Sequence, residues 1–222
     1  QELAIPVALA GSDVIAEAQT GSGKTLAFAL PLLNRVEQGK GVQAIVLVPT
    51  RELALQVADD FRKLSRYNHV RIATIYGGVG FGQQFNDLRS ASIVVGTPGR
   101  VMDHINRRSL NLSKCSMAVL DEADSMLDMG FIHDVTFILK QTAADRQVML
   151  FSATINNELQ NIVRNFARDP KRLSVIPQDE AKVGNVTQHY VSIPRENWIQ
   201  ALNHLLKDMK GQILIFCRTK HE

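Results

Sequence analysis

The chain has 222 residues, of which 45% are hydrophobic and 21% are charged, so it can bury the core of one large or two small domains. Its formal net charge of +3 gives only mild support for a polyanionic partner. It contains no uncharged apolar run of about 18 residues and no secretory leader, so we expect no membrane contact. Cys115 and Cys217 lie far apart, which fits a reducing compartment and, by default, the cytoplasm.

A glycine-rich stretch lies between the apolar run 14–16 and a helix-like segment that begins near Lys24. Its residues are Ala18, Gln19, Thr20, Gly21, Ser22, Gly23, Lys24 and Thr25. Glycines let the backbone curve so that its N–H groups point at phosphate oxygens, and the helix adds the positive end of its dipole. Lys24 supplies charge for the outer phosphates, and Thr25 supplies a hydroxyl for Mg²⁺. The pattern predicts a nucleotide-binding phosphate loop; a plain glycine-rich turn is the alternative, since Ala18 replaces the usual first glycine.

Short and almost wholly apolar runs recur along the chain, each followed by a segment with helical periodicity. Continuous apolar strands belong to a sheet covered on both faces, and their alternation with helices indicates a parallel α/β sheet. Apolar stripes in the helical segments are interpreted as facing the core. Strands are predicted at 44–48, 70–75, 93–95, 117–120 and 148–151.

Three acids, Asp121, Glu122 and Asp124, directly follow the apolar run 117–120. Open α/β sheets bind ligands at the carboxyl ends of their strands, and successive strand side chains point in opposite directions, so adjacent acids can take different roles. We predict that Asp121 coordinates Mg²⁺ through water and that Glu122 orients and polarises the water that attacks the terminal phosphate. The alternative is a solvated acidic helix cap.

A polar stretch at 177–186, interrupted by Pro and Gly, is typical of a linker. Beyond it we predict a strand at 187–193, a helix over 198–209 and a strand at 213–216. These elements would open a second α/β unit that stops too early to bury its own core. Because the chain begins at Gln1 without Met and ends directly after an apolar run, we interpret it as a fragment.

Seven short motifs occur in the order and approximate spacing of the DEAD-box RNA helicases, and they cover the whole chain. They are residues 18–25 (AQTGSGKT), 49–54 (PTRELA), 77–78 (GG), 97–100 (TPGR), 121–124 (DEAD), 152–154 (SAT) and 214–216 (LIF). In that family the first motif begins with Ala, which accounts for Ala18. The resemblance implies a RecA-like ATP-binding domain at 1–176, a linker at 177–186 and the truncated start of a second RecA-like domain at 187–222.

The resemblance also implies an RNA-binding set at three strand ends. Its members are Pro49, Thr50, Arg51, Gly77, Gly78, Thr97, Pro98, Gly99 and Arg100. Backbone N–H groups, threonine hydroxyls and arginine charges suit phosphates without reading bases. Singly, the Gly-Gly and Thr-Pro-Gly-Arg motifs are typical of ordinary turns. Jointly, their positions at strand ends favour the binding role.

Ser152 and Thr154 resemble the family motif that links ATP hydrolysis to duplex separation, and we expect their hydroxyls to bond with Asp124. Hydroxyl capping of a helix is the alternative. Gln1 resembles the glutamine of the adenine-recognising motif, since an amide can pair with both a donor and an acceptor on adenine. The aromatic residue that stacks on the base in the family would lie upstream of Gln1.

Together these motifs predict an ATP-dependent RNA helicase that uses ATP and Mg²⁺ and separates RNA duplexes locally. In the family, two domains close over ATP and bent single-stranded RNA. Arginines of the later second-domain motifs are absent from this chain, so we expect it to bind nucleotide but hydrolyse it poorly. The alternatives are a DNA helicase or translocase, disfavoured by the RNA-contact motifs, and a non-catalytic binding module, disfavoured by Lys24, Asp121 and Glu122.

The histidines carry no further prediction of a site. None is spaced with cysteine or carboxylates as in a metal centre. We expect solvated positions for His69, His104, His133, His189, His204 and His221.

Overall fold

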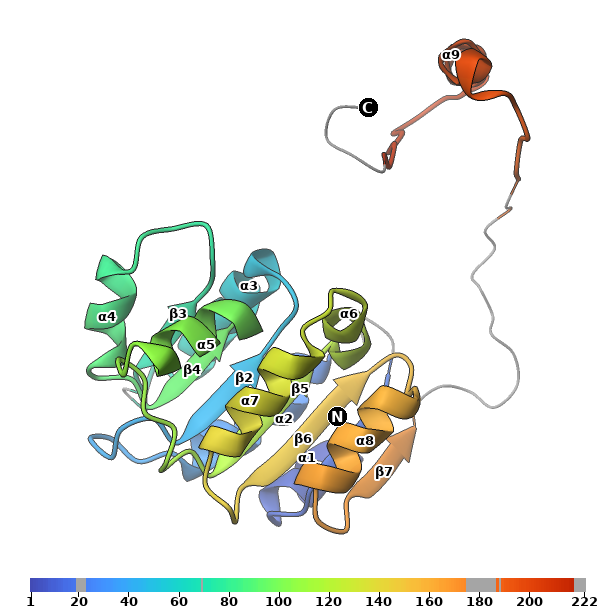
Figure 1. Ribbon diagram of the computed structural model, residues 1–222. Coiled ribbons are helices and arrows are strands. Elements are labelled where there is room, and N and C mark those ends of the chain that lie inside the picture. Colours follow the sequence, from blue (N-terminus) through green and yellow to red (C-terminus); the bar gives the residue numbers. More distant parts are fainter. Residues whose placement is uncertain (19–22, 69, 175–186, 188, 218–222) are drawn as a thin grey trace. The chain divides into compact units, whose positions relative to one another are not determined.

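A computed structural model describes residues 1–18, 23–68, 70–174, 187 and 189–217 (Figure 1). The chain divides into two units, residues 1–178 and 179–222.

Within the described residues, the first unit contains a sheet of seven strands in the order β3-β4-β2-β5-β6-β1-β7. The strands are β1 Val14–Glu17, β2 Ala44–Leu47, β3 Ile72–Ile75, β4 Ile93–Gly96, β5 Met117–Asp121, β6 Gln147–Ser152 and β7 Lys171–Ser174. Every pairing is parallel; in the middle of the sheet Val46 pairs with Val95 on one side and Val119 on the other. All carboxyl ends therefore reach one edge, as the apolar runs predicted.

Helices cover both faces of this sheet (Figure 1). One face carries α1 Ala4–Leu9, α2 Lys24–Arg35 and α3 Arg51–Leu64. The other face carries α4 Gly82–Leu88, α5 Pro98–Asn106, α6 Ala123–Asp128, α7 Ile132–Gln141 and α8 Asn157–Phe166. Alternate strand residues serve the two layers, so that Val46 packs in the first and Ile45 in the second. The predicted parallel α/β fold, covered on both faces, is confirmed.

An aromatic cluster supports the helix that begins at Lys24. The ring of Phe28 in α2 lies 6.1 Å from that of Phe61 in α3 and 5.4 Å from that of Phe151 in β6, measured between centroids. All three side chains are almost fully buried. Burial of such large rings stabilises the packing of α2 on the sheet, and so holds the start of this helix in place.

Buried polar side chains tie α1 to the sheet, a feature with no signal in the sequence pattern. The Gln147 amide donates to the carbonyls of Ala8 at 2.9 Å and Ser12 at 2.7 Å, and it accepts a bond from Arg35 at 2.6 Å. Asp13 accepts the Val148 N–H at 2.8 Å. These bonds fix α1, and with it the chain next to Gln1, against β6.

The second unit contains η1 Arg195–Asn197 and α9 Trp198–Asp208, so the predicted helix is present. In the described part of this unit, residues 187–193 and 213–216 form no strands, and both strand predictions are wrong for this structure. A strand needs neighbours to pair its backbone groups, and the described residues of this unit supply none. The predicted linker at 177–186 lies outside the described residues.

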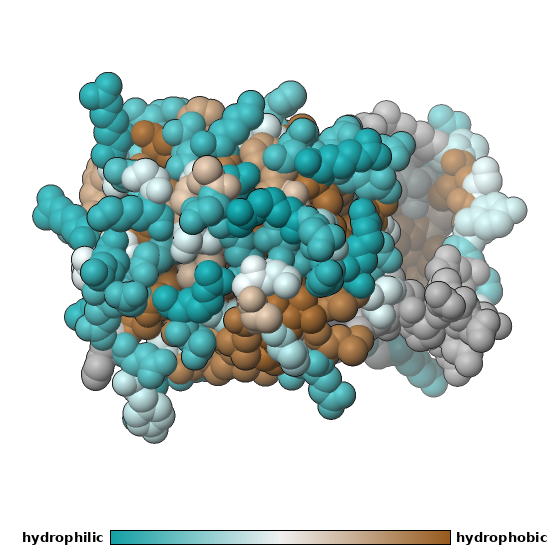
Figure 2. All heavy atoms as spheres, turned by 90° about the horizontal axis from the view of Figure 1, so that it is seen from below, coloured by the Kyte–Doolittle hydropathy of each residue, from teal (hydrophilic) through white to brown (hydrophobic). Residues whose placement is uncertain are grey.

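The face at the amino-terminal ends of the strands is mostly hydrophilic, with a smaller hydrophobic area (Figure 2). Among the helices of the described residues, none combines the length and the apolar character that a membrane span requires.

Candidate functional site

The chain around Lys24 forms the first part of the site, at the carboxyl end of β1. Gly23 precedes α2 in the left-handed region, with φ 77° and ψ 27°. A Cβ atom at Gly23 would collide with the side-chain amide of Gln1, which donates to the Gly23 carbonyl at 3.2 Å. The left-handed backbone conformation therefore favours glycine at this position, and a larger residue would displace the Gln1 amide. The predicted contacts of Gln19, Thr20, Gly21 and Ser22 lie outside the described residues.

The ammonium group of Lys24 is held by the loop itself. Its Nζ donates to the Ala18 carbonyl at 3.2 Å, and the Ala18 N–H donates to the Ser152 carbonyl at 2.9 Å. Lys24 and Thr25 are both half-buried in the first turn of α2. Lys24 can thus exchange one carbonyl oxygen for phosphate oxygens without leaving the site.

Asp121 ends β5 and is only 4% exposed. Its Oδ1 accepts the Glu122 N–H at 3.0 Å. Burial raises the pKa of Asp121 from 3.8 to about 6, a change that the charge of Lys24 opposes and that of Glu122 reinforces. A cation bound beside this carboxylate would offset the free-energy cost of burying its negative charge.

Glu122 forms the turn from β5 into α6 in a single residue. Its φ of 51° and ψ of 50° lie in the left-handed region, which non-glycine residues seldom adopt. Such a conformation costs about 1–3 kcal/mol and persists where the surroundings enforce it, often at functional sites. Asp121 belongs to the strand and Glu122 to the turn, so the two acids are held by different elements, as their predicted division of roles requires.

Asp124 is the centre of a hydrogen-bond network with the segment after β6. Its Oδ2 accepts the Ala153 N–H at 3.1 Å, the Thr154 N–H at 3.0 Å and the Thr154 hydroxyl at 3.2 Å. The Ser152 hydroxyl accepts the Asp124 N–H at 3.1 Å and donates to the Thr154 carbonyl at 2.7 Å. The predicted hydroxyl bond is confirmed for Thr154, whereas Ser152 bonds to the backbone of Asp124.

This network sets the charge state of Asp124. Burial raises the pKa of its carboxyl, but the hydrogen bonds that the carboxylate accepts, among them those from Thr154 and from the Ser125 N–H, outweigh burial and hold the pKa below its usual value. The carboxylate therefore stays ionised at neutral pH and keeps accepting all its donors.

Mg²⁺ fits this site only together with a phosphate ligand. Among the described residues, no three His, Cys, Asp or Glu side chains cluster so that they could hold a metal ion alone. Mg²⁺ at nucleotide sites is bound by one or two protein oxygens together with substrate phosphates and water. The Thr25 hydroxyl and the Asp121 carboxylate are the oxygens of that type here.

Asp121→Asn is expected to stabilise the chain in the presence of a metal chelator. A carboxyl whose folded-state pKa lies above its unfolded value destabilises the fold as pH rises from 3.8 through about 6. The gain should therefore be absent below pH 4 and reach at most about 3 kcal/mol at pH 7. Urea unfolding at both pH values measures it. Asp128→Asn, on the exposed end of α6, is the control, and an equal gain in both variants would contradict the effect.

The predicted RNA-binding set lies at the ends of three adjacent strands, β2, β4 and β3. The Val48 N–H donates to the Gly96 carbonyl at 3.0 Å, and the Thr97 N–H donates to the Ile75 carbonyl at 2.9 Å. Helices α3 and α5 begin here after Thr50 and Thr97, so two positive helix ends share this edge. The arrangement suits a chain of phosphates.

The residues of this set differ in their exposure and in the groups that they can present to a phosphate. Gly77 and Gly78 are exposed, Pro49 is buried, and the Thr50 hydroxyl accepts the Leu53 N–H at 3.2 Å as a helix cap. Arg51 is exposed, and its guanidinium carbon lies 4.9 Å from the centre of the Tyr76 ring. Direct phosphate contact is thus open to the glycine backbone and to Arg51.

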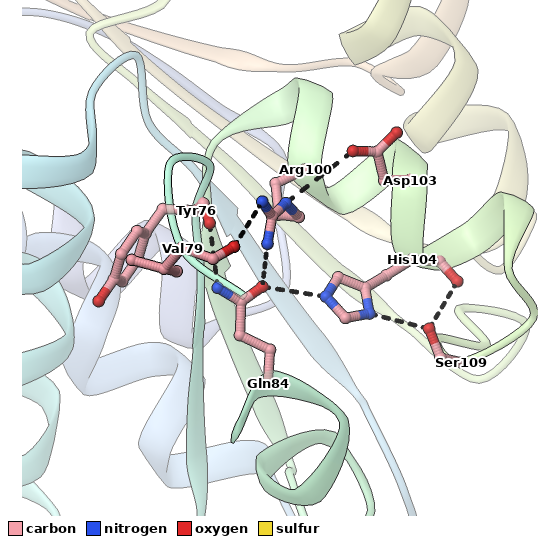
Figure 3. A network of polar contacts seen from close by, with 7 residues as sticks. All are labelled: Tyr76, Val79, Gln84, Arg100, Asp103, His104 and Ser109. Carbon is pink, nitrogen blue, oxygen red and sulfur yellow. Dashed lines mark hydrogen bonds and ion pairs between the residues drawn. The ribbon is translucent and has the colours of Figure 1, made fainter. Parts of the chain in front are cut away.

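Arg100 is engaged within the protein (Figure 3). Its Nη2 donates to the Val79 carbonyl at 2.9 Å, and its side chain is only 10% exposed. The guanidinium also lies 4.1 Å from the centre of the Phe81 ring. Its predicted contact with RNA stays a prediction, and in this structure the side chain holds the loop after β3.

The prediction of a solvated His104 is wrong. This residue is fully buried, with Nε2 3.0 Å from Gln84 Oε1 and Nδ1 2.8 Å from the Ser109 hydroxyl (Figure 3). Its partners come from α4 and from the turn after α5, which the sequence alone does not bring together. Three other histidines are exposed as predicted, His133, His189 and His204, while His69 and His221 lie outside the described residues.

Sequence reasoning also missed Gln84, which is 4% exposed and bonds to the Tyr76 carbonyl at 3.0 Å. One signal was available: Gln84 lies four residues before Leu88, on the buried side of α4. A polar residue at such a position needs partners, and these are the partners described above.

A model of the family described as DEAD/DEAH box helicase matches residues 1–162. A probable ATP-dependent RNA helicase of Methanocaldococcus jannaschii is 44% identical over 211 residues, or 95% of this chain and 56% of the relative. The ATP-dependent RNA helicase CshA of Listeria monocytogenes is 42% identical over 223 residues, or 99% and 43%. The chain spans about half the length of these curated relatives.

Two solved structures are also similar to this chain. A DEAD box protein from the hyperthermophile Methanococcus jannaschii matches with a TM-score of 0.76 and 43% identity, over 99% of this chain and 59% of that one. A hypothetical ATP-dependent RNA helicase from Sulfolobus tokodaii matches with a TM-score of 0.72 and 41% identity, over 78% of this chain and 51% of that one.

Proposed function

The chain belongs to the DEAD/DEAH box helicases, and on this premise we propose that the protein is an ATP-dependent RNA helicase. The family resemblance and the RecA-like fold expected from the seven motifs are confirmed. The proposed activity is binding of ATP with Mg²⁺ and of single-stranded RNA, and local separation of RNA duplexes coupled to ATP hydrolysis.

One observation carries this proposal: two kinds of phosphate-binding chemistry share one edge of the sheet. Lys24, Asp121 and Glu122 lie at the ends of β1 and β5, where they suit a triphosphate. The glycine loop at 77–78 and the starts of α3 and α5 lie at the ends of β3, β2 and β4, where they suit a polymer backbone. A nucleotide and a nucleic acid strand are the substrates that fit this combination.

Each residue of the nucleotide site has a proposed role. Lys24 binds the outer phosphates, and Thr25 and Asp121 hold Mg²⁺, which would neutralise charge on the phosphates. Glu122 orients and polarises the attacking water. Gln1, beside the Gly23 carbonyl, pairs with the base and favours adenine.

Communication between hydrolysis and RNA is assigned to the network of Asp124 with Ser152 and Thr154. Asp124 follows Glu122 by two residues and accepts two backbone N–H groups and one hydroxyl from the segment after β6. A shift of the acids during hydrolysis would therefore move residues 152–154 directly.

The chain itself is proposed to bind nucleotide without efficient turnover. We assign residues 1–176 to the first RecA-like domain, 177–186 to a linker and 187–222 to the start of the second. Arginines supplied by a complete second domain can accelerate phosphoryl transfer by about 10³–10⁵. A chain without them keeps the binding groups but lacks this stabilisation.

Steady-state ATP hydrolysis tests the proposal, with the full-length protein and this chain compared side by side. We expect single-stranded RNA to stimulate the full-length protein, and the chain alone to stay near background. Single-stranded DNA is the control. Equal stimulation by DNA would indicate a different motor, and absence of hydrolysis under all conditions would indicate a binding module.

A further inference from the structure

Side chains of α4 and α5 donate hydrogen bonds to the loop 76–81, which carries Gly77 and Gly78 (Figure 3). Gln84 in the first turn of α4 donates to the Tyr76 carbonyl at 3.0 Å, where the loop begins. Arg100 in α5 donates to the Val79 carbonyl at 2.9 Å, beyond the two glycines. Both ends of the glycine turn are thus tied by charged or amide donors.

Gln84 and Arg100 are also joined to each other and to His104. The Gln84 Oε1 accepts from His104 Nε2 at 3.0 Å and lies 3.4 Å from Arg100 Nη1. Because its Nε2 donates to Tyr76, the amide of Gln84 has one orientation only, with Oε1 toward His104. Both polar atoms of the buried Gln84 amide are therefore hydrogen-bonded. Gln84, Arg100 and His104 form one hydrogen-bonded group, the bracket, which holds the loop 76–81.

The required tautomer of His104 follows from this geometry. Gln84 Oε1 can only accept, so His104 must carry a proton on Nε2. Burial lowers the pKa of His104, as do the positive charges of Arg100 and Arg107, while Asp103 opposes them. A neutral ring with its proton on Nε2 satisfies Gln84 and leaves Nδ1 as an acceptor 2.8 Å from the Ser109 hydroxyl, whose single proton can point to Nδ1 or to the His104 carbonyl at 3.0 Å.

The ring of Phe81 packs against Arg100 and His104, two members of this bracket. This ring lies between two guanidinium groups, 4.1 Å from that of Arg100 and 4.3 Å from that of Arg107. The same ring meets His104 edge-on, with centroids 5.1 Å apart. The Arg100 guanidinium is thus packed against an aromatic ring, a cation–π contact that stabilises its position.

We propose that Gln84 and His104 are positioning residues for RNA binding, which hold the loop 76–81 in the conformation that receives the RNA backbone. The inference rests on the proposed function of that loop. Glycines lose more conformational freedom than other residues when ordered, so an unanchored Gly77-Gly78 turn would bind RNA at a higher entropic cost. Ordering the loop in advance removes that cost from the binding step.

Gln84→Met, which is close to Gln84 in size, removes the bond to the Tyr76 carbonyl and the bond to His104, and is the first test. We expect it to weaken binding of a labelled oligouridylate to the full-length protein by about tenfold, measured by fluorescence anisotropy with a non-hydrolysable ATP analogue. The RNA concentration for half-maximal ATPase stimulation should rise equally. The kcat at saturating RNA and the affinity for the nucleotide should not change, because Gln84 is not part of the nucleotide site.

Gln83→Met is the matched control. Gln83 is the neighbouring residue of the same type in α4, but it is exposed and bonds to Asp87 on the surface at 2.8 Å. RNA affinity of this variant should equal that of the unmodified protein. Equal weakening in the two variants, or none in Gln84→Met, would overturn the proposal.

A pair of substitutions at His104 serves if Gln84→Met fails to fold. A Gln side chain can place its amide nitrogen near the position of Nε2, whereas that of Asn reaches only as far as Nδ1. His104→Gln should therefore keep most of the RNA affinity, and His104→Asn should lose it. The reverse order, or no difference, counts against the bracket.

Gly78→Val separates failure of this inference from failure of the proposed function. Gly78 has a φ of 80°, so a branched residue there must change the loop itself. If Gly78→Val weakens RNA binding and Gln84→Met does not, the loop binds RNA and the bracket is dispensable. If Gly78→Val has no effect, the loop does not bind RNA and both assignments fail.

Discussion

Glu122→Gln in the full-length protein is expected to lower RNA-stimulated ATP turnover by at least about 100-fold, the size of a general-base contribution. The amide keeps the shape of the side chain, but it polarises water far less than a carboxylate does. ATP affinity should be retained, because Lys24 and the phosphate loop are untouched. Turnover is measured at saturating RNA and affinity with a fluorescent ATP analogue.

A second glutamate provides the control for this substitution. Glu158 lies exposed in the first turn of α8 and has no assigned role in the nucleotide site, so Glu158→Gln should leave turnover unchanged. Unchanged turnover in Glu122→Gln would remove Glu122 from the mechanism. Loss of ATP binding together with turnover would instead assign it to substrate binding.

Asp124→Ala is expected to lower the free energy of unfolding of the chain by about 2 kcal/mol at pH 7. The substitution leaves the donors of Ala153 and Thr154 without their acceptor, and bonds to charged groups contribute about 1.5–3 kcal/mol each when buried. Asp124 is only half-buried, so water replaces part of the loss. Urea unfolding measures the difference.

The pH dependence of this difference has a definite sign. The pKa of Asp124 is lowered in the folded chain, so its contribution is present above the unfolded value of 3.8 and is lost as pH falls through the lower folded value. The two proteins should therefore converge in acid. Thr154→Val, which removes one hydroxyl and leaves the backbone bonds, should cost less. A constant difference down to the acid limit would show that the carboxylate charge is not what matters.

Much of the fold could be read from local pattern. The run 44–48 is apolar at every position, and residues 44–47 form β2 in the centre of the sheet, covered on both faces. Glycines and a lysine before a helical period indicated the start of α2 in the same way. Such signals are local, because they depend on side-chain periodicity and on backbone freedom within a few residues.

Other outcomes depended on partners distant in the chain. The strand predicted at 187–193 had the expected composition, yet it has no paired neighbour among the described residues. Gln147 and Asp13 carried no visible role, although they tie α1 and the segment after α8 to β6. Pairing and polar satisfaction are properties of assembled elements, so composition alone does not report them.

The candidate site likewise has one part that contiguous motifs predict and another that depends on tertiary contacts. Residue types and their order along the chain were enough to identify the family and to predict a phosphate loop and two catalytic acids after β5, since each motif is contiguous. The tertiary structure alone decided that Arg100 turns inward to Val79 and that His104 is buried against Gln84. Those side chains come from α4, α5 and the loop after β3, and only the packing of α4 and α5 against the sheet brings them within hydrogen-bonding distance.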